Sequence, residues 1–573
     1  MPNKTQKKIK KNTRITKIGF IEDYRFIVLF LLFLILRIFV ENPYYFVAGD
    51  EARYLGLAQN FPYHTLYGDQ TLFLQHGPIF PYTIHLMNLI TQNDLLAGLL
   101  VSLVSAIITF FLLIKFWRLI GKDDRWICWF MLFFTLSETF VKLATIIYYE
   151  SLYFLIFISV LTSLIAYLKS QKNNKIKYKN FYLLLLSSLL GFIFAFSTDK
   201  VIFLIPIMLL MIIFYSSNRK NIVQYIPVAV TCIGYALVLI IRLSSFLHHD
   251  YIPIGVDGLV EDVRQFGIGQ LISPFSFSEG QKFATFRISI DPIQMAAAFG
   301  YSINIVPFNI PTVLDRSDFT QLINLRNILL VIIIYIPIML FILYGFIKNL
   351  KRNHFITLFA IITSFVFLTG LASNRHLIFF LIPLFYFFAE GVTAFIDNKF
   401  QKNNSQYSLK HQNNINYKNN TKKFDIFGNS NKEKILLIAI SVLLVTLFLI
   451  PKHSFSLTRE KVVQGYSVAE YINSIQEEKV FVQTGYSIEQ AYLLNKKVYG
   501  LVADTNKMLK YIDYFGIDYI VIGSKKWTHI DEPSINYIKS HPEKFKLIKT
   551  INETYPFPET PDTFYIFSVE NNN

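Results

Sequence analysis

Two adjacent carboxylates, Asp50 and Glu51, stand at the head of the run DEARYLGLAQNF and are the first groups that could do chemistry. Asp50 occupies the position of a helix N-cap, and the apolar residues Leu55, Leu57 and Ala58 favour a short helix lying in a membrane interface. A carboxylate there would be held at the boundary with water. The pair also fits a structural role, in which Asp50 caps the helix and Glu51 complements its dipole. This stretch alone leaves both roles open.

Four further groups could bind an anion or carry a charge. His76 heads the segment QHGPIFPY, whose prolines block a continuous helix, although a lone loop histidine is more often only solvated. Lys200 ends the turn STDK, where its ammonium could face an anion or simply snorkel. Arg375 lies in the turn SNRHL, and its planar fork of donors suits a phosphate. Glu150, in IIYYESLYF, adds a carboxylate that could equally be a capping charge.

Composition indicates that membrane-spanning helices position these residues. The chain has 573 residues, of which 53% are hydrophobic, 16% aromatic and 16% charged, with a mean hydropathy of +0.40. Soluble domains carry about a quarter charged residues. The formal charge of +16 does not indicate a nucleic-acid partner, because Lys and Arg are scattered between apolar runs. The two cysteines, Cys128 and Cys232, lie inside predicted spans and indicate neither a disulfide framework nor a metal site.

About eleven runs are long enough to cross the hydrocarbon core as α-helices. The basic segment 1–23 precedes the first run, which has no small-residue cleavage pattern after it and is therefore predicted to be a retained signal anchor. The predicted spans are 24–41, 95–117, 126–142, 147–168, 181–198, 201–216, 222–242, 325–347, 354–371, 375–396 and 434–451.

The charges between the spans predict a cytoplasmic N-terminus, because cytoplasmic loops carry the excess of Lys and Arg. With that orientation every internal segment is basic, whereas acidic residues outnumber basic ones in the external loops 41–94 and 243–324. All the candidate residues above then fall on the outer side. Ionisable groups at membrane depth are costly and usually mark a functional path, so their convergence favours a functional role.

The sequence predicts five segments: a cytoplasmic N-terminus, a transmembrane catalytic domain, a disordered linker, a last span and an outer domain. Their bounds are 1–23, 24–396, 397–433, 434–451 and 452–573. The linker is rich in Asn and Lys and is assigned to the cytoplasm. The outer segment is predicted to be a small extracytoplasmic α/β domain that covers the site or docks an acceptor. Its predicted strands are 479–485, 496–503, 517–524, 545–551 and 563–569, with helices at 466–477, 505–515 and 531–541.

As an ordered set, the candidate residues resemble the C superfamily of glycosyltransferases (GT-C), particularly the branch of protein O-mannosyltransferases and aminoarabinose transferases. The resemblance covers most of residues 20–395. Asp50-Glu51-Ala52-Arg53-Tyr54 looks like the acidic first-loop motif, and His76-Gly77-Pro78 like the Lys-Pro-Pro entry. Thr198-Asp199-Lys200 resembles the Thr-Lys turn, and Arg375-His376-Leu377 the Arg-Tyr-Leu turn. The sequence departs from the pattern at His76-Gly77 and His376, and it lacks the Trp-Trp-Asp-Tyr-Gly motif of oligosaccharyltransferase catalytic subunits.

The resemblance implies a membrane enzyme that moves a sugar from a polyprenyl-phosphate donor to a hydroxyl of a lipid, glycan or protein acceptor, with inversion at the anomeric carbon. Asp50 would be the base and Glu51 would position it or the sugar. The implied donor-phosphate ligands are Lys200, Arg375, His76 and Arg53, and the further candidates are Glu150, Tyr54 and His376. No cofactor is required, and we expect no metal, although an Asp-Glu pair beside a phosphate can recruit a divalent cation.

The expected location is the plasma membrane, with membrane lipids as further partners and no nucleic acid. The main alternative is a polytopic transporter or a flippase for lipid-linked sugars. Such proteins commonly show internal repeats and binding groups near the bilayer midplane, and the sequence shows neither. A non-catalytic receptor that works through its outer domain is a third possibility.

Overall fold

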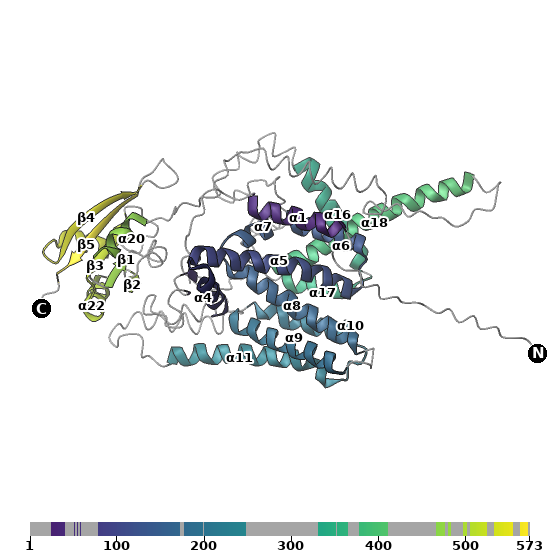
Figure 1. The fold of residues 1–573 in the computed structure, drawn as a ribbon, viewed down its shortest axis with the longest axis horizontal. Helices are drawn as coiled ribbons and strands as arrows, with labels where there is room; N and C mark the ends of the chain where they lie inside the picture. Colours follow the sequence, from purple (N-terminus) through teal and green to yellow (C-terminus); the bar gives the residue numbers. More distant parts are fainter. Residues whose placement is uncertain are drawn as a thin grey trace, which may run out of the picture.

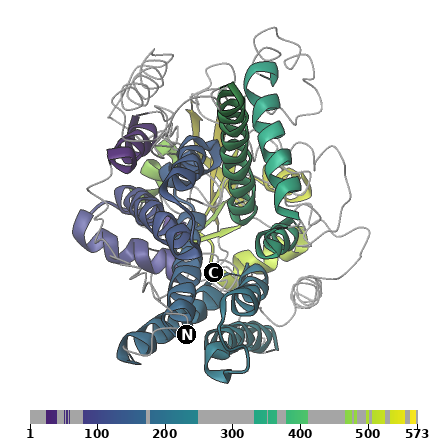
Figure 2. The ribbon, with the colours of Figure 1, turned by 90° about the vertical axis from the view of Figure 1, so that its right-hand side faces the viewer.

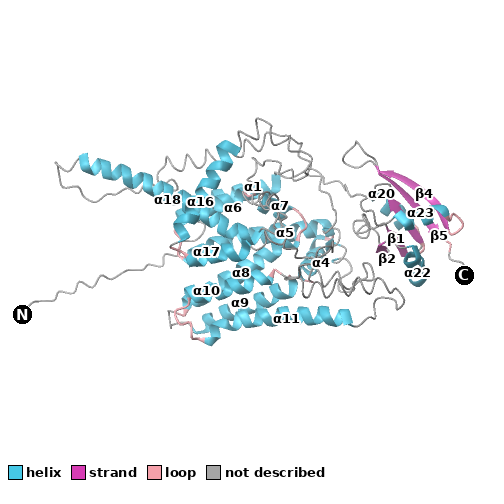
Figure 3. Ribbon diagram, turned by 180° about the vertical axis from the view of Figure 1, so that it is seen from behind, coloured by secondary structure: helices cyan, strands magenta, loops and turns pink. Residues whose placement is uncertain are grey.

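The computed structural model contains a helical part within residues 24–410 and an α/β part within residues 466–570 (Figure 1). Figure 3 shows the described strands confined to the C-terminal part. The structure describes residues 24–39, 51, 54, 55, 58, 78–171, 177–198, 200–247, 331–350, 352–364, 378–410, 466–475, 479–482, 497–500, 505–523, 532–553 and 562–570.

Local capping explains where two successive helices end and begin. Helix α5 (Asp94–Ile120) starts after Asn93, whose side chain accepts a hydrogen bond from a backbone N–H three residues further on, at 3.0 Å. It ends at Gly121, whose φ of +102° is a left-handed conformation that glycine adopts at little cost. Asp123 then caps helix α6 (Asp124–Leu136) by accepting a backbone hydrogen bond at 2.8 Å.

The helices form a bundle in which neighbours in space are often neighbours in sequence. Helix α5 packs against α4 and α8, α8 against α9, and α9 against α11, and Figure 1 shows α5, α8, α9 and α11 side by side. Figure 2 shows the grouping from the side, where α16 and α18 pack against each other. The remaining bounds are α1 (Tyr24–Phe39), α4 (Ile79–Thr91), α7 (Glu138–Thr145), α8 (Tyr149–Ser170), α9 (Lys177–Ser197), α10 (Val201–Tyr215), η3 (Ile222–Tyr225), α11 (Ile226–Leu247), η4 (Val331–Tyr335), α16 (Ile336–Leu350), α17 (His354–Ser364) and α18 (Ile378–Lys410).

Five helices among the described residues are long and apolar enough to cross a membrane. They are Asp94–Ile120, Tyr149–Ser170, Asn180–Ser197, Ile332–Leu350 and Ile378–Asp397. Shorter apolar helices lie at Val201–Tyr215, Ile222–Val238 and His354–Ser364. These segments coincide with predicted spans, and the full number of eleven stays a prediction, because the span at 434–451 lies outside the described residues.

Burial separates central helices from peripheral ones. The most apolar windows of α8 and α18 are 83% and 78% buried, whereas those of α9 and Ile332–Leu350 are only 39% and 28% buried. A helix that is apolar all round and half exposed is what a lipid-facing span requires. Helices α8 and α18 therefore form the centre of the bundle, and they are the helices that begin beside the candidate residues Glu150 and Arg375.

The prediction of one continuous span over 126–142 is wrong. Helix α6 ends at Leu136, and α7 begins at Glu138, with Ser137 in an extended conformation between them. Ser137 makes no side-chain cap hydrogen bond, whereas Glu138 complements the dipole of α7 in its first turn and pairs with Lys142 one turn later, at 2.5 Å. The predicted span therefore consists of two helices that meet at polar residues.

Helix α18 extends to Lys410, so residues 397–410 of the predicted disordered linker are helical. This part of the linker contains neither glycine nor proline, which would end a helix. The helix that crosses the apolar layer therefore continues into the polar sequence that follows it. Residues 411–433 lie outside the described part of the chain.

The C-terminal part contains a five-stranded sheet of order β2-β1-β3-β5-β4. The three strands β2, β1 and β3 pair in parallel, and β5 joins β3 and β4 by antiparallel pairing. Strand β3 is buried from Tyr519 to Ile522, as expected for a central strand covered on both faces. The bounds are α20 (Tyr466–Asn473), β1 (Lys479–Val482), β2 (Lys497–Gly500), α22 (Thr505–Phe515), β3 (Tyr519–Gly523), α23 (Glu532–Ser540), β4 (Phe545–Glu553) and β5 (Asp562–Val569).

Candidate functional site

The predicted acidic segment presents one buried helical face. Glu51, Tyr54, Leu55 and Ala58 have helical backbone, and each is no more than 5% exposed. Their spacing of three, four and seven residues places them on one side of a helix. Glu51 is therefore turned into the protein together with the aromatic ring of Tyr54. The predicted base Asp50 and the predicted phosphate ligand Arg53 lie outside the described residues.

Helix α4 supports this segment through two contacts. The ring of Tyr54 meets the ring of Phe80 edge-on, with 5.3 Å between the centroids. The Nδ1 atom of His85 lies 3.0 Å from the carbonyl oxygen of Ala58, at hydrogen-bond distance. The segment is thus fixed at both Tyr54 and Ala58. His76, predicted just before this helix, lies outside the described residues.

Two of the predicted residues, Glu150 and Lys200, form an ion pair. The Nζ atom of Lys200 lies 3.4 Å from Oε1 of Glu150, and the two side chains are 13% and 0% exposed. Glu150 is in the first turn of α8, where the helix dipole favours a carboxylate. Lys200 immediately precedes α10, and its backbone N–H donates to the Thr198 hydroxyl at 3.3 Å. The pair joins the outer-side ends predicted for two spans.

Tyr149 connects the ion pair to the acidic segment. Its ring lies 4.8 Å from the Lys200 Nζ atom and meets the Tyr54 ring edge-on at 5.6 Å. An ammonium over an aromatic face is attracted by the ring quadrupole, by about 0.5–2 kcal/mol depending on exposure. Tyr153, one turn later on α8, packs behind Tyr149 at 4.8 Å. Glu51, Tyr54, Tyr149, Glu150 and Lys200 therefore belong to one cluster, which we call the outer cluster.

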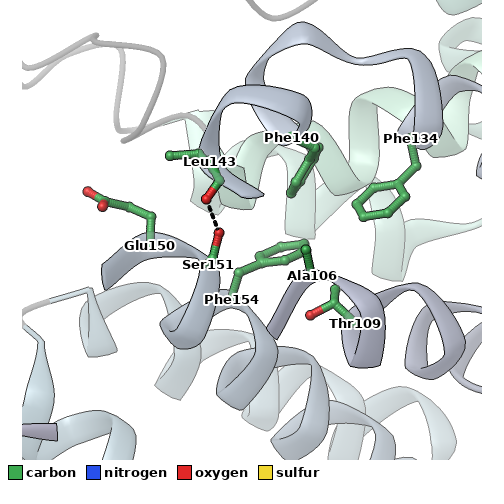
Figure 4. Close-up of a pocket in the computed structure, with 8 residues that line it drawn as sticks. All are labelled: Ala106, Thr109, Phe134, Phe140, Leu143, Glu150, Ser151 and Phe154. Atoms are coloured by element: carbon green, nitrogen blue, oxygen red, sulfur yellow. Dashed lines mark hydrogen bonds between the residues drawn. The ribbon is translucent and has the colours of Figure 1, made fainter. Parts of the chain in front are cut away.

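A small cavity lies against the outer cluster, between α5, α6, α7 and α8 (Figure 4). Its volume of about 10 Å³ has room for about one water molecule. Figure 4 shows the Ser151 hydroxyl donating to the Leu143 carbonyl, while the Glu150 side chain points away from the aromatic lining. The lining residues are Ala106, Thr109, Phe134, Phe140, Leu143, Glu150, Ser151 and Phe154.

A buried arginine on α1 contacts α6, one of the helices that line the cavity. The sequence pattern did not indicate it as a functional residue. Arg37 is 3% exposed, and its NH1 group donates to the carbonyl oxygens of Phe33 at 3.2 Å and Thr135 at 3.3 Å. Its guanidinium also lies 3.6 Å from the centroid of the Phe33 ring. Thr135 is in the last turn of α6, so Arg37 binds one of the carbonyls exposed by the break before α7. The sequence feature that could have indicated this residue is a charge near the end of a predicted span.

The start of α18 faces the outer cluster. The ring centroid of Phe379, the second residue of α18, lies 6.0 Å from the Lys200 Nζ atom. Arg375 and His376 directly precede this helix in the sequence and lie outside the described residues. Of the predicted site, the structure links Tyr54 to Lys200 and Glu150 through Tyr149, and Glu51 lies on the same helical face as Tyr54. Among the residues it describes, no group of three or more His, Cys, Asp or Glu is arranged to hold a metal.

No protein-family model and no curated protein matches this sequence. Among solved structures, the archaeal oligosaccharyltransferase AglB from Archaeoglobus fulgidus, in complex with an inhibitory peptide and a dolichol-phosphate, is similar, with 13% identity, 88% of this chain and 69% of that chain covered, and a TM-score of 0.48. The Archaeoglobus fulgidus oligosaccharyltransferase in the apo form is 12% identical, with 87% of this chain and 69% of that chain covered and a TM-score of 0.46. Its complex with Zn and sulfate is also 12% identical, with 87% of this chain and 67% of that chain covered and a TM-score of 0.46. All three TM-scores lie below 0.5.

Proposed function

We propose that this chain is an integral membrane glycosyltransferase of the GT-C type, which transfers a sugar from a polyprenyl-phosphate donor to an acceptor hydroxyl on the outer face of the plasma membrane. The observation that supports it most is the outer cluster. It joins the predicted acidic segment, through Tyr54 and Tyr149, to a lysine at the end of a different span. Such a transfer needs a base and a phosphate-binding cation near each other, and the cluster connects Lys200 to the segment that contains Asp50 in the sequence.

The proposed reaction is a single displacement at the anomeric carbon. The acceptor oxygen forms a bond to that carbon, and its proton goes to Asp50. The bond between the carbon and the phosphate oxygen breaks, and its electron pair stays on the phosphate. A general base contributes about 10²- to 10⁴-fold, and preorganised cations at the leaving oxygen stabilise the developing charge. Lys200 supplies one such cation, and Arg375, His76 and Arg53 are the other proposed phosphate ligands.

Glu51 has a different role from Asp50 in this proposal. It is 5% exposed and shares a helical face with Tyr54, which is fixed against α4 and α8. A buried carboxylate on that face is suited to orienting the neighbouring Asp50 or a sugar hydroxyl rather than to exchanging protons with water. In this proposal Tyr54 fixes the position of the acidic segment relative to Lys200, because both residues contact Tyr149.

The test is transfer of radiolabelled sugar from polyprenyl-phosphate donors by the purified chain in nanodiscs, with wild type and Asp50→Asn side by side. We expect transfer by the wild type and a loss of at least about 100-fold in Asp50→Asn. The matched control is Asp94→Asn, which removes a carboxylate from the first turn of α5, outside the proposed site. A wild type inactive across hexosyl and pentosyl donors, or a fully active Asp50→Asn variant, would refute the proposal.

The same preparation separates the enzyme from the alternative of a flippase for lipid-linked sugars. Fluorescent lipid-linked sugar placed in one leaflet of vesicles reports movement across the membrane, and sugar transfer is scored separately. The proposal expects transfer without movement. Movement without transfer would favour the flippase.

A further inference from the structure

The ion pair between Glu150 and Lys200 has the properties of a functional rather than a stabilising contact. Its carboxylate is 0% exposed and its lysine side chain 13% exposed, and 3.4 Å separates the Nζ and Oε1 atoms. Removing two charges from water costs several kcal/mol for each ion, and their attraction often only offsets this cost. Replacing a buried ion pair by two apolar residues of similar volume is often neutral or stabilising. The pair therefore has to be explained by what the lysine does.

The surroundings of Lys200 fix the position of its ammonium. A lysine carries a compact charge on a flexible stem with about 2 kcal/mol of rotamer entropy. Here the charge meets the Glu150 carboxylate on one side, the Tyr149 ring at 4.8 Å and the Phe379 ring at 6.0 Å. These contacts come from α8 and α18, whereas the backbone of Lys200 belongs to the start of α10. Three helices thus define one position for the ammonium.

We propose that Glu150 is a positioning residue, which holds the Lys200 ammonium on the Tyr149 ring and directs it toward the leaving phosphate of the donor. This inference rests on the proposed function. Glu150 itself does not touch the reacting atoms. Its carboxylate keeps the cation in place before the donor arrives, so that little reorganisation is needed when the bond to the anomeric carbon breaks and the electron pair moves to the phosphate oxygen.

This arrangement separates the two carboxylates of the outer cluster by task. Glu51 belongs to the segment that carries the proposed base, whereas Glu150 lies across Tyr149 from it and pairs with the cation. Without Glu150, Lys200 would sample other rotamers and would still reach the phosphate part of the time. Loss of Glu150 should therefore act only through Lys200.

A double-mutant cycle tests that dependence. Lys200→Met should lower kcat about 100-fold or more, as the loss of one preorganised donor to a developing charge does. Glu150→Gln keeps the shape of the side chain and should lower kcat about 10- to 100-fold, the effect typical of removing a partner that orients a ligand. In the Lys200→Met background, Glu150→Gln should cause no further loss. Glu150→Asp should restore part of the activity, and KM for the acceptor should stay constant throughout.

A structural role predicts a different pattern. Glu150→Gln would then lower the unfolding temperature while kcat stays at the wild-type value, or the two losses of activity would simply multiply. Either result overturns the inference. The double replacement of Glu150 and Lys200 by methionine guards against misfolding, because it leaves neither charge buried alone. We expect that variant to be folded, with an unfolding temperature close to that of the wild type, and inactive.

The chain offers a matched control at another ion pair. Lys122 Nζ contacts the Glu390 carboxylate, and these side chains are 20% and 16% exposed. The lysine also lies 4.4 Å from the centroid of the Tyr386 ring, so the chemistry is the same as at the outer cluster. Glu390→Gln should lower the unfolding temperature and leave kcat and the KM for the donor unchanged. An equal loss of kcat in this variant would show that the effect of Glu150 is not specific to the site.

Binding of farnesyl phosphate distinguishes failure of this inference from failure of the proposed function. We expect Glu150→Gln to weaken binding about tenfold when Lys200 is present and to have no effect in Lys200→Met. Unweakened binding, with sugar transfer intact in the wild type, would overturn the role of Glu150 and leave the enzyme proposal standing. Absence of transfer with weakened binding would overturn the enzyme and retain the phosphate site.

Discussion

Two glycines let α16 and α18 approach so closely that either should resist substitution. A Cβ atom added at Gly345 would lie 1.9 Å from the Phe387 carbonyl oxygen, and one at Gly391 would lie 2.0 Å from that of Phe341. Ordinary van der Waals contact begins at 3.4 Å, so the helices would have to separate by about 1.5 Å. In a bilayer such close packing is a main source of helix association, because lipid removes the hydrophobic driving force between helices.

Gly345→Ala should therefore destabilise the bundle strongly. All the nearest atoms are backbone atoms of α18, which cannot rotate away as a side chain can. The cost should reach at least about 3 kcal/mol, the upper end of the range for overpacked cores. The separation would also move α18, whose first residues contact Lys200 through Phe379. Activity and stability should fall together.

The control is Gly98→Ala, where the new Cβ would lie 2.9 Å from side-chain atoms of Ile147. Those atoms can adjust by a change of rotamer, so a much smaller loss is expected. The assay is thermal unfolding in nanodiscs, followed by intrinsic tryptophan fluorescence, together with sugar transfer. An unfolding temperature of Gly345→Ala at or above that of Gly98→Ala would refute the close approach of the two helices.

Three further predictions concern single groups. Arg37→Met should cost about 2–4 kcal/mol, because charge-assisted hydrogen bonds to two buried carbonyls are lost, and Arg37→Lys should recover only part of it; thermal unfolding measures both. Burial lowers the pKa of Lys122 below 10.5, although the neighbouring Glu390 carboxylate opposes this shift. Between the lowered pKa and 10.5 the unfolded state therefore binds more protons than the folded state. The free energy of unfolding should rise with pH in that window. Lys122→Met should flatten that rise in denaturation measured across alkaline pH. Tyr54→Leu should lower kcat with little change in donor KM, because the edge-on ring contacts that fix the acidic segment are lost.

The periodicity of the sequence located most elements but not the contacts between them. The helices at 466–473, 505–515 and 532–540 and the first three strands lie within segments that the hydrophobic pattern predicted, and β4 and β5 extend one or two residues beyond theirs. The prediction of a continuous span over 126–142 was wrong because it rested on the average composition of the segment, whereas the break is local and lies at Ser137 and Glu138. Average hydropathy cannot detect a helix that ends and restarts within the apolar layer.

The candidate site was predictable in part for a related reason. Loop charge indicated that Glu150 and Lys200 lie on the same side, and the structure pairs them across 50 residues of sequence. Which carboxylate pairs with which cation depends on the packing of α8 against α10, and the pattern along either helix does not reveal it. The contact between Arg37 and Thr135, which are 98 residues apart, could not be predicted for the same reason.

The polar contacts of this bundle divide into those that end helices and those that join them. Arg37 binds a carbonyl at the end of α6, a need that any broken helix in lipid creates. The pair of Glu150 and Lys200 instead joins the starts of two helices, α8 and α10, through their side chains. A buried charge pair often stabilises a fold no better than two apolar residues of similar volume, which favours an explanation outside stability. That difference is why we propose a role in binding phosphate for Lys200 and infer a structural role for Arg37.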